Sequence, residues 1–81
     1  VILLVMSSVK AGPQLTHRQR QALATQKLIV DAARSLFLAR GYAATTIDDI
    51  AREAGVAVST VYSVFGNKRG IFRAIREALH Q

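Results

Sequence analysis

The side chains that usually perform catalysis or bind metals are scarce in this sequence. It contains no cysteine and only two histidines, His17 and His80, which lie near opposite ends of the 81 residues and at no metal-ligand spacing. No nucleophile and base form a catalytic motif, and there is no glycine-rich phosphate-binding loop. We therefore expect no catalytic residue, no bound metal, no cofactor and no enzyme activity.

The chemistry that remains is that of cations. Eleven Lys and Arg outnumber five Asp and Glu, which gives a formal net charge of +6. A small basic domain suggests a polyanionic partner, and nucleic acid is the commonest. Arg18, Arg20 and Lys27 could follow a phosphate backbone or a minor groove, or could equally form a solvated face. The lack of cysteine suits a reducing cytoplasm.

Ala51, Gly55 and Val61 have the spacing of a helix-turn-helix. Two helices that cross steeply over a short turn need a small residue at their closest approach, a residue without a Cβ in the turn, and a branched apolar residue that faces inward. The three residues meet these needs in that order. The pattern predicts a helix-turn-helix over about residues 46–65.

Four segments carry a helical period of apolar residues, and none alternates as a strand would. The first is expected between a capping Thr16 and Gly41, the second begins at a capping Thr46, the third covers about 58–65, and the fourth follows a capping Asn67. The fold class is therefore all-α: a three-helix bundle with a helix-turn-helix, plus the start of a long fourth helix. The expected core consists of Ile29, Ala33, Leu36, Phe37, Ile47, Ile50, Ala51, Val61, Phe65 and Phe72.

The beginning of the chain differs from the rest. Residues 1–15 contain Ser, Gly and Pro and are expected to form a flexible arm. The apolar run at residues 1–6 is far shorter than the roughly 20 residues that cross a bilayer. Binding to a membrane surface is an alternative for a basic amphipathic segment, but Gly55 and Gly66 argue against one long amphipathic helix.

Three segments resemble the DNA-binding domain of TetR-type transcriptional regulators. Residues 36–47 (LFLARGYAATTI) are similar to the family's connection between its first two helices, and residues 50–56 (IAREAGV) to its second helix. Residues 59–68 (STVYSVFGNK) are similar to its recognition helix and the step beyond. The resemblance covers roughly residues 26–75 and implies a DNA-binding domain over residues 16–81.

The function that the resemblance implies is sequence-specific binding of double-stranded operator DNA in the major groove, by a ligand-responsive repressor in the cytoplasm. It further implies a homodimer formed through an effector-binding and dimerisation domain absent from this chain, with a small-molecule effector bound there and no membrane partner. The 81 residues offer no evident dimer surface. We therefore expect the chain alone to be mainly monomeric and to bind duplex DNA weakly.

The resemblance also assigns residues to the DNA. The positions that face base edges are Val58, Ser59 and Ser63. The positions that meet the DNA backbone are Thr46, Thr60, Tyr62 and Lys68. Hydroxyl and ammonium groups donate to phosphate, and the first residues of a helix that enters the groove face the bases. The ring of Tyr62 is expected to be buried, with its hydroxyl on the DNA.

Lys68 and two positions outside this set, Ala57 and Val64, carry further expectations. Lys68 would stand in the first turn of the fourth helix, where a cation opposes the helix dipole, so a phosphate rather than local stability is expected to explain it. Ala57 replaces a usual capping Ser or Thr, which should cost the third helix about 1 kcal/mol. Val64 replaces a frequent phosphate-binding His or Tyr. A TetR-like protein that has lost DNA binding is the remaining alternative, and Thr60, Tyr62 and Lys68 argue against it.

Overall fold

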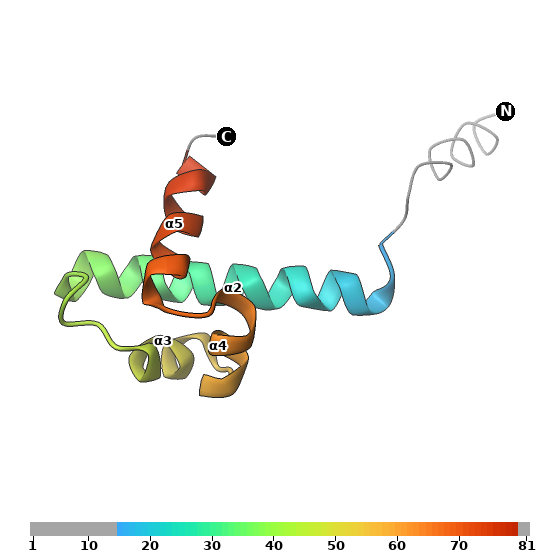
Figure 1. Cartoon of the computed structure of the whole chain (residues 1–81), viewed down its shortest axis with the longest axis horizontal. Coiled ribbons are helices and arrows are strands. Elements are labelled where there is room, and N and C mark those ends of the chain that lie inside the picture. Colours follow the sequence, from blue (N-terminus) through green and yellow to red (C-terminus); the bar gives the residue numbers. More distant parts are fainter. Residues whose placement is uncertain (1–14, 80–81) are drawn as a thin grey trace, which may run out of the picture.

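The computed structural model describes residues 15–79, and within this range it contains helices and no strand. The helices are α2 (His17–Arg40), α3 (Ile47–Ala54), α4 (Val58–Phe65) and α5 (Lys68–Leu79). The long α2 forms the axis of the domain, α3 and α4 lie along one side of it, and α5 crosses it steeply (Figure 1). The all-α prediction is confirmed, whereas the arm expected at residues 1–15 lies, except for Leu15, outside the described residues.

The first helix begins and ends where its caps predict. The Thr16 Oγ1 atom accepts from the Gln19 backbone N–H at 3.0 Å, and the Gln19 Oε1 atom accepts from the Thr16 N–H at 2.8 Å. At the other end the Gly41 N–H donates to the Phe37 carbonyl at 2.8 Å. The buried side chains of α2 all lie in its second half, and the beginning of the helix extends beyond the other helices (Figure 1).

The core forms where all four helices meet. Its fully packed members are Ile29, Ala32, Ala33, Leu36, Ile50, Ala51, Val61, Ile71 and Ile75. The predicted members Phe37, Ile47 and Phe65 are partly buried against this cluster. The helix-turn-helix therefore packs on α2 and α5 as one unit, and each of the four helices contributes buried apolar residues to the core.

The prediction that Phe72 belongs to the core is wrong, because this residue is 41% exposed. The inward positions of α5 are taken by Ile71 and Ile75, one helical turn apart, so Phe72 lies on the flank of the helix. Its ring packs instead against those of Phe37 and Tyr42, with centroids 6.3 and 5.5 Å away. An aromatic cluster of Phe37, Tyr42 and Phe72 thus covers the edge of the core.

The joint between α4 and α5 is very tight. The Gly70 N–H donates to the Asn67 Oδ1 atom at 2.8 Å, which confirms Asn67 as the cap of α5. A Cβ atom added to Gly70 would overlap the backbone carbonyl of Phe65, the last residue of α4. This close approach requires glycine, and it fixes the end of the helix-turn-helix against α5.

Candidate nucleic-acid interface

The turn between α3 and α4 is fixed by Gly55, whose φ of 75° and ψ of 32° are left-handed. Its N–H donates to the Arg52 carbonyl at 3.3 Å, and the Val56 N–H donates to the Ala51 carbonyl at 3.0 Å. These two bonds form a Schellman motif, which satisfies two of the last backbone carbonyls of α3. The predicted roles of Ala51, Gly55 and Val61 agree with this geometry, since Ala51 and Val61 are buried.

The start of α3 is held by a reciprocal cap. The Asp49 N–H donates to Thr46 Oγ1 at 3.0 Å, and the Thr46 N–H donates to Asp49 Oδ2 at 3.1 Å. Arg40 and Arg52 lie 3.1 and 3.5 Å from the same carboxylate. The hydrogen bonds from Thr46, followed by the two arginines, lower the pKa of Asp49 below its ordinary value. Thr46 is exposed while its hydroxyl caps the helix.

Helix α4 has two faces. Val61 is buried and Val64 and Phe65 are partly buried against the core. The opposite face is exposed and consists of Val58, Ser59, Tyr62 and Ser63. Because positions i, i+1, i+4 and i+5 share one side of a helix, these four side chains form a continuous surface, which we call the recognition face.

The structure brings four of the predicted site residues, Val58, Ser59, Tyr62 and Ser63, together on the exposed face of α4, with one correction. Tyr62 was expected to bury its ring, but the residue is 51% exposed. Its neighbour Val61 takes the inward position, and the tyrosine therefore stands on the recognition face. Thr60 lies at the border and is half-buried. Ala57, as predicted, gives α4 no side-chain cap.

Lys68 has partners that the sequence did not reveal. Its Nζ atom donates to the carbonyls of Tyr42 and Thr45 at 2.7 and 2.9 Å, and lies 4.2 Å from the centroid of the Tyr42 ring. Thr45 is fully buried, and its Oγ1 donates to the Gly41 carbonyl at 2.8 Å. The start of α5 is thereby tied to the connection between α2 and α3.

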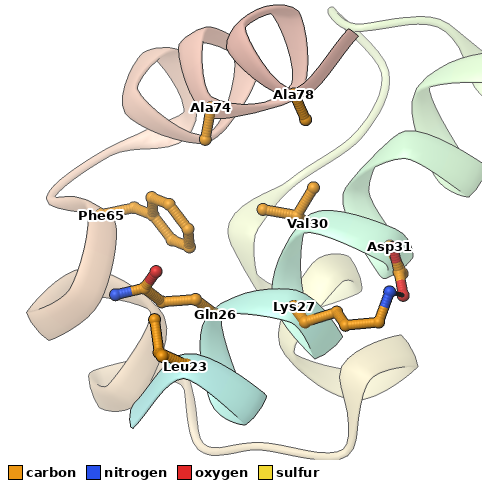
Figure 2. A pocket seen from close by; sticks show the side chains of 8 residues that line it. All are labelled: Leu23, Gln26, Lys27, Val30, Asp31, Phe65, Ala74 and Ala78. Atoms are coloured by element: carbon orange, nitrogen blue, oxygen red, sulfur yellow. Dashed lines mark ion pairs between the residues drawn. The ribbon is translucent and has the colours of Figure 1, made fainter. Parts of the chain in front are cut away.

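Two grooves flank α5, away from the recognition face. The larger, about 320 Å³, lies between the first half of α2, the end of α4 and α5, and Figure 2 shows Phe65 facing Val30 across it. The smaller, about 240 Å³, lies beside Phe72 and Leu38. None of the seven residues assigned to DNA lines either groove.

Two basic residues of α2, Arg20 and Lys27, have local partners. Lys27 lies 3.6 Å from Asp31, and an Arg20 guanidinium nitrogen donates to the Leu15 carbonyl at 2.9 Å. Both contacts are exposed and therefore weak, so they are compatible with a solvated face and with contact to DNA phosphates. In the part of the chain that the structure describes, no helix combines the length and apolar character that crossing a membrane requires.

Comparison with known proteins places the fold in a family. Residues 29–75 match the family described as "Bacterial regulatory proteins, tetR family". The chain is 43% identical over 51 residues to the uncharacterized HTH-type transcriptional regulator YvkB of Bacillus subtilis, and this match covers 63% of the chain and 27% of the relative. It is 38% identical over 63 residues to the HTH-type transcriptional regulator TtgR of Pseudomonas putida, covering 78% of the chain and 30% of the relative.

A third relative is the HTH-type transcriptional repressor ComR of Escherichia coli. The chain is 36% identical to it over 58 residues, which cover 72% of the chain and 28% of the relative. The chain thus spans less than a third of the length of each of these relatives. The family match includes α3, α4 and most of α5, so it covers the whole helix-turn-helix. The chain therefore belongs to the tetR family of bacterial regulatory proteins, which are DNA-binding transcriptional regulators.

Proposed function

We propose that this chain binds a specific double-stranded DNA sequence by placing the recognition face of α4 in the major groove. The division of α4 carries this proposal: Val61 anchors the helix in the core, and the opposite face is exposed and free of acidic side chains. Ser59 and Ser63 are small enough to let the helix approach base edges, and the Val58 methyls suit the methyl group of thymine. These three residues are proposed to read the sequence.

The DNA backbone is proposed to meet hydroxyls beside this face. Thr46 is exposed at the start of α3, and its hydroxyl is proposed to donate to a phosphate. Tyr62 projects from the recognition face and Thr60 borders it, and both carry a hydroxyl donor. The net charge of +6 adds a sequence-independent attraction. Contacts of this kind position the helix, whereas contacts with bases choose the sequence.

The whole regulator is proposed to be a ligand-responsive repressor that acts in the cytoplasm. Two copies would form a homodimer through a part outside these 81 residues, with two α4 helices in successive major grooves about 34–36 Å apart. A small-molecule effector would bind in that same part. The match covers less than a third of each relative, which supports a further part in the whole regulator. One relative is named a repressor, which supports the proposed sign of regulation.

The test is a selection of preferred duplexes from a random pool, made with the chain and two variants. Ser59→Arg and Ser35→Arg add the same charge at exposed positions, one on the recognition face and one on α2. We expect both to bind DNA somewhat more tightly, but only Ser59→Arg to change the preferred sequence, towards guanine where arginine donates to O6 and N7. Equal preferences in all three proteins would refute base reading by α4.

A second assay separates this function from the alternatives. The chain is mixed with anionic phospholipid vesicles and with duplex DNA at the same ionic strength. Binding to duplex DNA that weakens steeply with salt is the expected result. Binding to vesicles alone would indicate a membrane-surface protein, and binding to neither would indicate a family member that serves in protein interaction only.

A further inference from the structure

Lys68 bridges the two ends of the helix-turn-helix segment. The residues of this segment, 46–67, run from the cap of α3 to the cap of α5. Immediately before it lies Thr45 and immediately after it lies Lys68, and the Lys68 ammonium group donates to the Thr45 carbonyl at 2.9 Å. The bond therefore joins residues 23 positions apart in the chain and holds the two ends of the segment together.

The geometry points to Lys68 as a positioning residue that holds α3 and α4 in their DNA-binding orientation, rather than as a ligand of phosphate. This inference rests on the proposed function. An ammonium group has three protons, and two are donated to the carbonyls of Tyr42 and Thr45. The face of the Tyr42 ring lies 4.2 Å from the same nitrogen. A phosphate would have to compete with these partners.

The neighbours of this contact explain how it acts on the recognition face. Thr45 is fully buried and bonded to the Gly41 carbonyl, so Lys68 attaches α5 to a rigid point of the chain. Thr46, the next residue, begins α3, and α3 carries α4 through the fixed turn at Gly55. A shift at Thr45 is therefore transmitted to both helices of the motif.

The position of Lys68 in α5 supports a tertiary role. A cation in the first turn of a helix opposes the dipole, and α5 has no acidic residue in its first turn to offset it. Hydrogen bonds to a charged donor are roughly twice as strong as neutral ones. The two carbonyls of the α2–α3 connection thus supply the compensation that the helix itself lacks.

The experiment compares Lys68→Arg and Lys68→Ala with Arg69→Ala, which removes a cation from the neighbouring exposed position. Lys68→Arg keeps the charge and binds phosphate well, but its planar guanidinium is a poor substitute for a point donor shared by two carbonyls and a ring. Circular dichroism first establishes the temperature at which each variant is folded. At that temperature, amide hydrogen exchange of residues 45–49 and the affinity for duplex DNA are measured over a range of salt.

We expect Lys68→Arg and Lys68→Ala to speed amide exchange at residues 45–49 and to weaken DNA binding about tenfold while still folded, because a charge-assisted contact no longer fixes the geometry. The dependence of log affinity on log salt should keep its slope in both. Arg69→Ala should leave the exchange at residues 45–49 unchanged.

The opposite pattern would overturn the inference. If Lys68→Arg matches the unmodified chain in exchange and affinity, the carbonyl contacts do not position the motif. If Lys68→Ala lowers the magnitude of the salt slope by about 0.9 without changing exchange, Lys68 is a phosphate ligand. Should the unmodified chain bind no duplex DNA, the proposed function fails, while accelerated exchange in Lys68→Arg would still establish the structural bridge.

Discussion

Helices α3 and α4 have the same length, eight residues each, but their first turns are built in opposite ways. Helix α3 begins with a reciprocal cap from Thr46 and Asp49, and two arginines lie beside the capping carboxylate. Helix α4 begins at Ala57, makes no side-chain cap and has no acidic residue in its first turn. The chain thus secures α3 with its own side chains and holds α4 mainly by packing, which leaves the exposed side of α4 for a partner.

The largest expected effect tests whether side-chain packing contributes more than the cap to the stability of α3. Ile50 is a fully buried residue of α3, and Ile50→Ala should lower the free energy of unfolding by about 2–5 kcal/mol, because the lost transfer free energy and the cost of the cavity add. Urea denaturation measures this loss. The control is Val58→Ala on the exposed face of α4, which should change stability by no more than about 0.5 kcal/mol. Equal losses would contradict the division between buried and exposed faces.

The end of α4 depends on a close approach that α3 does not use. Gly70→Ala would place a methyl group on the Phe65 carbonyl, at an overpacking cost of about 1–3 kcal/mol that exceeds the helix propensity gained from alanine, about 1 kcal/mol. Net destabilisation in thermal unfolding is the expected result. A more stable Gly70→Ala variant would show that α4 and α5 can separate without loss.

Two single substitutions, one at the start of each helix, should reverse the difference between the capped α3 and the uncapped α4. Ala57 already has the extended backbone of a cap, with φ −72° and ψ 149°, so Ala57→Ser should add about 1 kcal/mol of stability. Thr46→Ala should remove about as much from α3. Both changes are measured by urea denaturation. A loss of stability in Ala57→Ser would mean that the start of α4 is unsuited to a cap for some reason other than its residue type.

The smallest effect concerns the pH dependence of α3. The pKa of Asp49 is lowered by the Thr46 hydrogen bonds and the two arginines, so the charged carboxylate favours the folded state above the ordinary pKa of 3.8. This contribution disappears as the pH falls through the lowered pKa of the folded protein. Asp49→Asn should therefore be less stable than the unmodified chain at neutral pH, with a difference that shrinks under acid. A constant difference down to about pH 2 would contradict the assigned cause.

Much of the fold was predictable because its signals are local. The caps at Thr16, Thr46 and Asn67 act over three residues, and the apolar period of each helix lies within that helix. The turn at Gly55 follows from a glycine at a fixed distance from Ala51 and Val61. Local chemistry of this kind can be read without knowledge of the partners in space.

The remainder depends on contacts across the chain. The two carbonyl oxygens that accept from Lys68 belong to residues 23 and 26 positions away, and no period or spacing indicates them. Phe72 and Tyr62 belong to apolar stripes wider than the surface each helix buries, so the stripe alone did not show which residue would remain outside. The DNA contacts assigned to Thr46, Val58, Ser59, Thr60, Tyr62 and Ser63 stay predictions, whereas Lys68 is proposed to position the motif.

The central claim, that the exposed side of α4 meets the DNA, is tested most directly by amide chemical-shift mapping of the chain during titration with duplex DNA. We predict that the largest changes fall on Thr46 and residues 58–63, with little change at Leu38 and Leu79, which line the smaller groove away from the recognition face. Changes concentrated around Leu38 and Leu79, with α4 unaffected, would contradict the account.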